Sequence, residues 1–265
     1  MAQFERDMPS GARDERFNVA LARGLAILRA FHVGATYLGN AELARRVGIP
    51  KATVSRMTYT LTQLGYLRYA EDVDKYEIAP GVLALGYAFL AKTNIHVVAR
   101  PLMSDFARES NTVVSIGMLD RNYVVALEYA KGSTVSFQET AVGFSMPVAR
   151  TAIGWACMAA MPVAERERLL NTLKQVYASK FDTLRSKIEH ALVEVAQRGF
   201  CCSIGTYEKR NNAIGVPLVV PGMKYILALN CYAPERILTP QSMSEIWGPK
   251  LVKLARAIKR GLLEE

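Results

Sequence analysis

The sequence predicts a two-domain α+β protein: a small domain of three helices and a β-hairpin, then a larger domain with an antiparallel sheet and flanking helices. Three observations lead to this prediction. The chain has 265 residues, which suits two domains of ordinary size. Apolar residues recur at helical spacing between residues 18 and 64, and two short alternating runs follow around a polar turn. Beyond residue 94, strand hairpins alternate with helices, which is typical of α+β domains.

The first predicted elements are three helices. Residues 1–16 show no period, so we expect a disordered arm. The first helix starts at Asn18 and ends at 32–34. Asn40 is expected to be the N-cap of the second helix, and Gly48-Ile49-Pro50 separates the second helix from the third. The expected buried stripe of the third helix consists of Val54, Met57, Leu61 and Leu64.

A β-hairpin is predicted directly after these helices. Residues 66–69 and 75–78 alternate around the acidic turn 71–74. Three helices with a tight turn between the second and third, followed by a hairpin, are the outline of a winged helix-turn-helix. We place this domain at residues 17–80. A linker at 81–93 follows, whose apolar helix is expected to pack on the other domain or on a second copy of itself.

The larger domain is predicted to span residues 94–265. Helices are expected at 97–110, 151–161, 163–172, 183–198 and 241–263, and strands at 112–119, 123–129, 135–139, 214–220 and 226–232. Strand hairpins interspersed with helices predict an antiparallel sheet with helices against it.

Charge and composition limit the classes of partner that the protein can be expected to bind. The net charge is +9, and residues 16–68 contain eight basic residues and a single acid, Glu42. Such a stretch suits a phosphate-binding face, although a solvated basic surface is the alternative and the C-terminal helix is also basic. No apolar run approaches the roughly 20 residues of a membrane helix, and the N-terminus lacks the apolar core of a signal peptide. We expect a cytoplasmic protein with no membrane partner.

The cysteines and histidines predict no metal centre. Cys157, Cys201, Cys202 and Cys231 form no Cys-x-x-Cys pair, and the three histidines lie far apart in the sequence. We therefore expect reduced, packed thiols, with neither a metal nor another cofactor.

The third helix carries the most specific pattern. Its predicted packing leaves small, hydrogen-bonding or cationic side chains exposed and no acid. Such side chains can reach base edges and phosphates in a major groove, whereas a protein-docking winged helix is the alternative. The expected DNA-binding residues are Arg23, Lys51, Thr53, Ser55, Arg56, Tyr59, Thr60, Gln63, Arg68 and Lys75.

These residues also carry a resemblance. Leu43-Ala44, Gly48 to Arg56 and Leu64-Gly65-Tyr66 resemble the IclR-family pattern Leu-Ala-x-x-x-Gly-Ile/Leu-Pro-Lys-Ser-Thr-Val-x-Arg followed by Leu-Gly-Tyr. Met146 to Ala156 and Ile214 to Pro217 resemble further family motifs, so the likeness covers nearly the whole chain from Phe17. The resemblance implies a GAF-like effector domain, assembly as homodimers or homotetramers, and repression or activation of transcription at a DNA operator, governed by a small organic or aromatic acid.

A candidate effector site follows from a predicted strand-turn-helix at residues 146–156. A helix N-terminus suits an anion, so Thr151, Ala152 and Ile153 are expected donors beside Met146. Arg150 is expected to pair with a carboxylate, unless it points to solvent.

The family resemblance adds further effector residues: Ser203, Asn211, Ala213, Asn230 and Tyr232. Many relatives have an acid in place of Ser203 and a cysteine in place of Ala213, so their effectors do not transfer directly. Phe137, Phe144 and Trp155 are candidates for an aromatic wall or for core packing.

Two other functions remain as alternatives. An enzyme is not expected, because the sequence has no nucleophile elbow, phosphate loop or zinc signature. An architectural DNA-binding protein, whose larger domain only oligomerises, stays open. The expected mechanism is a pair of winged helices on two half-sites, with effector binding acting through the linker helix.

Overall fold

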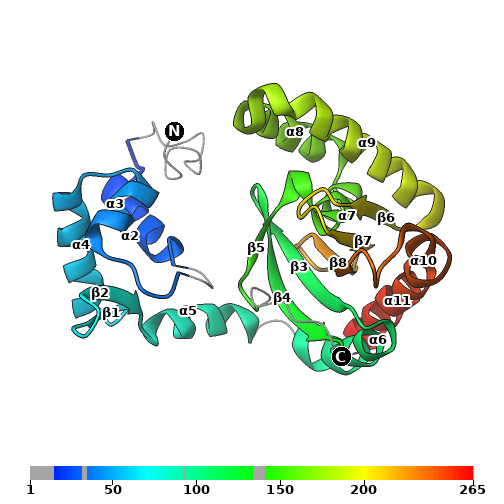
Figure 1. Ribbon diagram of the computed structural model, residues 1–265, viewed down its shortest axis with the longest axis horizontal. Coiled ribbons are helices and arrows are strands. Elements are labelled where there is room, and N and C mark those ends of the chain that lie inside the picture. Colours follow the sequence, from blue (N-terminus) through cyan, green and yellow to red (C-terminus); the bar gives the residue numbers. More distant parts are fainter. Residues whose placement is uncertain (1–14, 32–34, 92–93, 134–140, 265) are drawn as a thin grey trace. The chain divides into compact units, whose positions relative to one another are not determined.

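A computed structural model describes residues 15–31, 35–91, 94–133 and 141–264 (Figure 1). The chain divides into two compact units, residues 1–92 and 93–265, and each unit is described by itself. Most of the predicted arm, the predicted end of the first helix at 32–34, and the predicted strand at 135–139 with Phe137 lie outside the described residues.

The first unit is a winged helix-turn-helix, as predicted. Its described elements are α2 (Val19–Arg29), α3 (Asn40–Val47), α4 (Lys51–Gln63), β1 (Leu67–Ala70), β2 (Lys75–Ile78) and α5 (Gly81–Leu90). The strands β1 and β2 pair in an antiparallel hairpin. Buried apolar side chains from all three N-terminal helices and from β1 form one core, including Ile27, Leu43, Val54 and Leu67.

The turn between α3 and α4 depends on Gly48. Its backbone is left-handed, with φ 75°, and its N–H donates to the carbonyl of Ala44 at 2.8 Å. A residue with a Cβ adopts this conformation only at a cost, so glycine ends α3 and turns the chain sharply. Pro50 is the N-cap of α4, where its lack of an N–H is harmless.

Two details of the sequence prediction for this unit are wrong. The N-cap of α3 is Gly39, and Asn40 is the first helical residue, where its Oδ1 accepts a hydrogen bond from Thr58 Oγ1 at 3.0 Å. Leu64 is 62% exposed, because it is the C-cap of α4 and has left the buried stripe.

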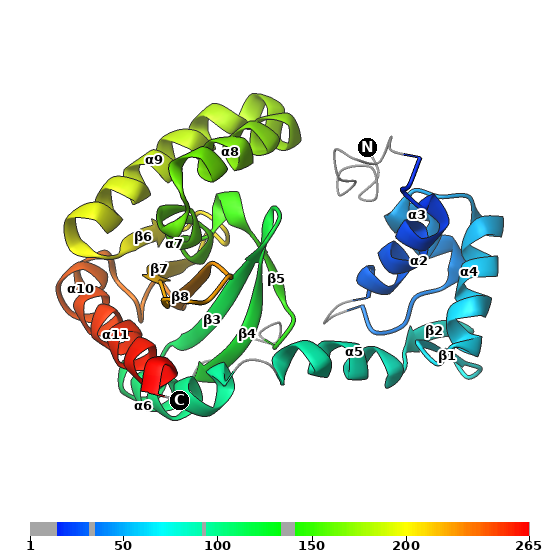
Figure 2. The ribbon, with the colours of Figure 1, turned by 180° about the vertical axis from the view of Figure 1, so that it is seen from behind.

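The second unit contains a six-stranded antiparallel sheet with the order β5-β4-β3-β8-β7-β6 (Figure 2). Its strands are β3 (Val113–Asp120), β4 (Tyr123–Lys131), β5 (Ser145–Pro147), β6 (Cys201–Ile204), β7 (Asn211–Leu218) and β8 (Leu227–Pro234). β5 lies where the strand of the strand-turn-helix at 146–156 was predicted, whereas β6 was not predicted, because four residues are too few to show a period of two. These two short strands form the edges of the sheet.

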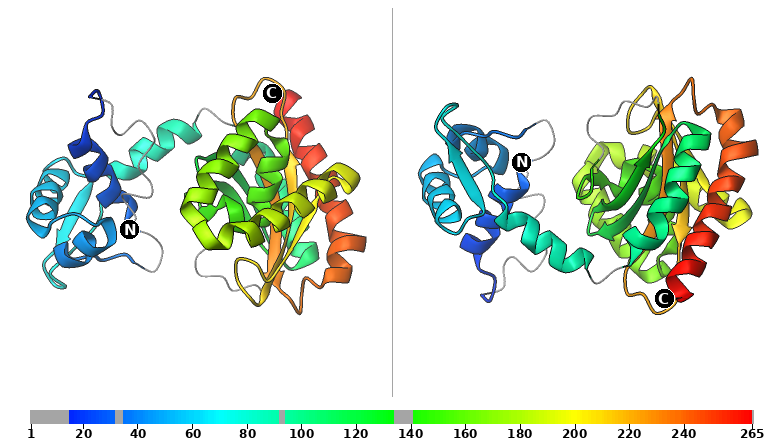
Figure 3. Two further views of the ribbon diagram at one scale, coloured as in Figure 1. Left: turned by 90° about the horizontal axis from the view of Figure 1, so that it is seen from above. Right: turned by 90° about the horizontal axis from the view of Figure 1, so that it is seen from below.

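Helices cover both faces of this sheet (Figure 3). One face carries α6 (Ile95–Ser110) and α11 (Gly248–Glu264), and the other carries α7 (Ala152–Ala160), α8 (Val163–Tyr177) and α9 (Phe181–Arg198). The second face buries an apolar core that includes Ile153, Trp155, Leu170 and Ile188. The unit also contains the 3₁₀ turns Val148–Arg150 and Ala178–Lys180.

The C-terminal helix differs from its prediction. A single helix was expected at 241–263, but α10 (Pro240–Ser242) leads into a π-helical segment, Met243–Trp247, before α11 begins. Gly248 lies against the ring of Phe200, where a Cβ would clash with the ring.

In the described part of the chain, no single helix has both the length and the apolar character needed to cross a membrane. The bent pair of α5 and α6 meets that test by length and composition alone.

Candidate functional sites: the outward face of α4 and a polar face of the sheet

One side of α4 is a continuous exposed face. Val54 and Thr58 are fully buried on the inner side of the helix. The exposed residues are Lys51, Ala52, Ser55, Arg56, Tyr59, Thr60 and Gln63. Ala52, Arg56, Tyr59 and Gln63 are spaced by four, three and four residues, so they lie along one line of the helix surface. Ala52 was not predicted, because a methyl side chain gives no polar signal in the sequence.

Two of the predicted DNA-binding residues on α4 are less available than expected. Thr53 is half-buried at the side of the helix, instead of fully exposed. The hydroxyl of Thr60 donates to the carbonyl of Arg56 at 3.0 Å. Arg56 and Tyr59 therefore supply the longest side chains of this outward face.

Polar contacts join α4 to α3, and α3 to the end of α2. Thr58 joins it to Asn40 at the start of α3. Arg46 donates to Glu42, with 2.7 Å between Nη2 and Oε1, and to the carbonyl of Ala30 at 3.2 Å, which ties α3 to the end of α2. The hydrogen bond from Arg46 lowers the pKa of Glu42. Arg46 thus has a structural role, so not every cation of this basic stretch is available to DNA.

The other cations among the predicted DNA-binding residues differ in how available they are. Arg68 is bonded to Glu77, with 2.7 Å between Nε and Oε1, and this ion pair neutralises its charge. Arg23 is half-buried, and within the described residues its Nε has no partner. Lys51 and Arg56 are exposed and form no ion pair with any described carboxylate. Lys75 is exposed at the end of an acidic hairpin turn, Glu71 to Asp74.

In the second unit, cross-strand pairing brings polar side chains onto one face of the sheet. Ser115, Asn230, Gly215 and Cys201 are successive partners across β3, β8, β7 and β6. The adjacent row on the same face contains Val113, Tyr232, Ala213 and Ser203. We call these two rows the polar rows. Four of the five residues that the family resemblance added, all but Asn211, therefore lie in neighbouring rows.

Asn230 and Ser203 are the buried polar members of these rows. They are 4% and 5% exposed. Ser115 Oγ donates to Asn230 Oδ1 at 2.5 Å, which leaves the amide N–H groups of Asn230 without an acceptor in the described part of the chain. The hydroxyl of Ser203 likewise makes no hydrogen bond within the described residues. Among the described residues, the buried side-chain nitrogen and oxygen atoms without a partner are Arg23 Nε and Arg198 Nε, so Asn230 Nδ2 and Ser203 Oγ keep some contact with solvent. Both groups can therefore bond to water or to a ligand.

The first turn of α7 lies directly over Gly215. A Cβ at Gly215 would overlap the carbonyl oxygen of Ala152, so only glycine allows this approach. Thr151 is the N-cap, and its Oγ1 accepts from the N–H of Gly154 at 3.2 Å. The N–H groups of Ala152 and Ile153 have no acceptor among the described residues. An N-terminus with free donors therefore lies above rows whose polar side chains have unused hydrogen-bonding capacity.

Arg150 precedes this N-terminus and reaches the loop between β6 and β7. Its Nη2 donates to the carbonyl of Tyr207 at 3.4 Å, and its guanidinium carbon lies 5.7 Å from the centroid of the Tyr207 ring. Burial raises the pKa of Tyr177, and the nearby charge of Arg150 opposes that rise. Arg150 is half-buried, and it joins the turn before α7 to the loop between Ser203 and Asn211.

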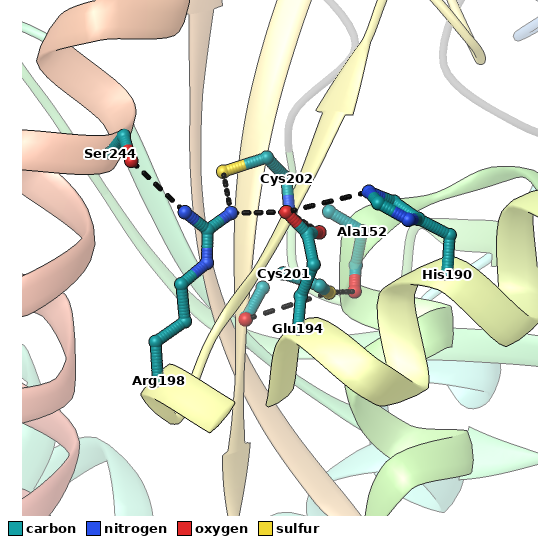
Figure 4. A network of polar contacts seen from close by, with 8 residues as sticks. Ala152, His190, Glu194, Arg198, Cys201, Cys202 and Ser244 are labelled. Atoms are coloured by element: carbon teal, nitrogen blue, oxygen red, sulfur yellow. Dashed lines mark hydrogen bonds and ion pairs between the residues drawn. The ribbon is translucent and has the colours of Figure 1, made fainter. Parts of the chain in front are cut away.

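A cluster of charged residues on α9 binds the edge strand β6 (Figure 4). Glu194 of α9 accepts from Arg198 and, at 3.0 Å, from the backbone N–H of Cys202. Arg198 also donates to Ser244 Oγ at 3.0 Å and lies 4.2 Å from the centre of the Phe200 ring. Burial raises the pKa of the Cys202 thiol to about 11, so this thiol is protonated at neutral pH.

The other predicted site residues are part of the protein core. Met146 lies on β5 and is 7% exposed, and Trp155 is buried with its Nε1 donating to the carbonyl of Ala149 at 3.0 Å. Phe144 is partly buried against the same core. Ser115 was missed, although a serine among the apolar residues of a predicted strand was a usable signal.

Comparison with known proteins identifies the family. The IclR helix-turn-helix domain matches residues 20–71, and the bacterial transcriptional regulator IclR C-terminal domain matches residues 87–260. The chain belongs to the IclR family. Members of this family are DNA-binding transcriptional regulators, and α4 lies inside the matched helix-turn-helix domain.

Individual IclR-family proteins resemble the chain over nearly its full length. It is 30% identical to the HTH-type transcriptional regulator TsaQ1/TsaQ2 of Comamonas testosteroni, over 91% of this chain and 87% of the relative. The crystal structure of an IclR family regulator from Brucella abortus superposes with a TM-score of 0.83 and 34% identity, covering 97% of each chain. An IclR homolog from Microbacterium hydrocarbonoxydans, complexed with 4-hydroxybenzoate, has the same fold, with a TM-score of 0.68 and 22% identity over 93% of this chain and all of that one.

Proposed function

We propose that this IclR-family regulator binds a small aromatic carboxylate at the first turn of α7, and that the bound acid changes the affinity of α4 for its operator. One observation carries the proposal: the free N–H groups of Ala152 and Ile153 lie over polar rows in which the amide N–H groups of Asn230 and the hydroxyl of Ser203 have no protein partner among the described residues. A carboxylate would satisfy the helix N-terminus, and a polar group on the same molecule would satisfy the rows.

The chemistry of the site favours an acid with a neutral polar group. Arg150 and the helix N-terminus supply positive charge, whereas Ser203, Ser115 and Asn230 are neutral. An aromatic ring between the two ends would lie near Tyr232, which belongs to the same face. The IclR homolog that holds 4-hydroxybenzoate shares the fold, which supports this class of ligand.

The experiment is a thermal-shift screen of the full chain against small organic acids, with hydroxybenzoates included. Arg150→Ala is compared with Arg236→Ala, which removes an exposed cation elsewhere in the same unit. An acid present at about 100 times its Kd adds about 2.7 kcal/mol of stability. We expect wild type and Arg236→Ala to be stabilised equally and Arg150→Ala much less. Equal shifts in all three would remove Arg150 from the site, and no shift with any acid would overturn the effector proposal.

We further propose that the protein works as a cytoplasmic homodimer or homotetramer and catalyses no reaction. α5 supports self-association, because within its described residues no side chain is buried and Leu83, Leu85 and Tyr87 are 57–73% exposed. Light scattering after gel filtration gives the oligomeric state, and replacing Leu83 and Leu85 with Ser should shift it toward the monomer. A mass that stays unchanged would place the interface elsewhere.

A further inference from the structure

We propose that Ala52 and Arg56 select the operator half-site: the methyl group of Ala52 contacts a thymine methyl, and Arg56 pairs with a guanine within about three base pairs of it. This inference rests on DNA binding by α4 and adds the bases that the helix reads. It starts from the finding that Ala52 lies in the first turn of α4, exposed and on one line with Arg56.

Position matters because helix-turn-helix proteins touch base edges with the N-terminal residues of this helix. Ala52 is the second residue of α4, and Arg56 begins the next turn on the same outward line. Four residues of α-helix rise about 6 Å. Base pairs are about 3.4 Å apart along the duplex. Because the helix is inclined to the duplex axis, the two side chains reach bases at most about two steps apart.

The chemistry of each side chain selects a different base. An arginine fork matches the O6 and N7 acceptors of guanine, and an alanine methyl packs on the C5-methyl of thymine. Arg56 is free for this role, since it forms no ion pair within the described residues, whereas Arg46 and Arg68 are held by Glu42 and Glu77.

This chain also departs from the IclR pattern at Ala52. The pattern has serine after Pro-Lys, and the sequence here is Pro50-Lys51-Ala52-Thr53. A serine hydroxyl both donates and accepts, so it tolerates several bases. A methyl group offers only apolar contact and therefore favours the single base that carries a methyl. We expect a thymine requirement that relatives with serine lack.

The test begins with selection of bound sequences from a random DNA library by the full chain. Each thymidine of the resulting half-site is then replaced singly by deoxyuridine, which removes only the methyl group. At one position we expect wild type to bind about fourfold more weakly, as for the loss of one buried methyl group. Ala52→Ser should lose the thymine preference there, and Arg56→Ala should lose the guanine preference.

Arg45→Ala is the matched control, because Arg45 is a highly exposed cation on α3, outside this line. It should weaken binding uniformly and leave the selected sequence unchanged. Unaltered affinity with deoxyuridine at every thymine, or an unchanged consensus with Ala52→Ser, overturns the inference while leaving DNA binding intact. Failure to select any sequence overturns both the inference and sequence-specific binding.

Discussion

Gly215 shows how one residue positions the proposed effector site. Its missing side chain lets the carbonyl of Ala152 lie against β7, which places the N-terminus of α7 over the polar rows. Gly215→Ala should destabilise the second unit by about 1–3 kcal/mol, because the helix must move to make room. Urea denaturation followed by tryptophan fluorescence measures this, since Trp155 and Trp247 both belong to this unit.

Gly86→Ala provides the contrast. Gly86 lies inside α5, where a Cβ would meet nothing within 4 Å. The same substitution should stabilise that helix by about 0.5–1 kcal/mol and leave the tryptophan transition unchanged. Equal midpoints for Gly215→Ala and wild type would show that α7 can move away without cost, and the close approach would then have no role in building the site.

At the scale of elements, the edge strand β6 depends on α9. Glu194 is only 15% exposed and accepts both from Arg198 and from the N–H of Cys202. Glu194→Ala should cost about 2–3 kcal/mol, because it leaves Arg198 unpaired and a strand N–H unsatisfied. Glu194→Gln keeps a neutral acceptor and should lower the free energy of unfolding by about half as much.

Glu189→Ala is the control. It breaks only the exposed pair with Arg185, so it should change the free energy of unfolding by less than about 1 kcal/mol. Similar losses for Glu189→Ala and Glu194→Ala would contradict this assignment.

Elements with strong periodicity were predictable, and the contacts between them were not. The helices α3 and α4 were predicted because Gly48 and Pro50 punctuate a clear apolar stripe. The strand β6 was missed because Cys-Cys-Ser-Ile has no alternation, and its pairing with β7 comes from tertiary structure. The ion pair between Arg68 and Glu77 was also not predicted, because it follows from the hairpin register, which places the two residues opposite each other.

On the scale of the whole molecule, one part of the candidate site could be predicted from the sequence and the other part could not. The donors of the α7 N-terminus were predicted from one local motif around Thr151. The polar rows required the order β3-β8-β7-β6, which joins residues more than 80 positions apart. Only the family resemblance pointed to Ser203 and Asn230, because no local pattern links them. The sequence therefore predicts the proposed anion-binding end of the site, and the strand order brings the rest of the site together.

The two units, 1–92 and 93–265, can influence each other only through a coupling free energy, and such coupling is reciprocal. If a bound acid weakens operator binding by a certain factor, saturating operator must weaken acid binding by the same factor. Typical couplings amount to about 5–150-fold. We therefore expect calorimetric titration of the full chain with the acid to give Kd values that differ by this factor with and without operator DNA. At an operator concentration that just saturates wild type, Arg56→Ala should bind the acid with the wild-type Kd and show a smaller effect of added operator, because less of the variant is bound to DNA. An acid affinity that operator DNA leaves unchanged in wild type would mean that the two sites are independent, and the acid would then not regulate DNA binding.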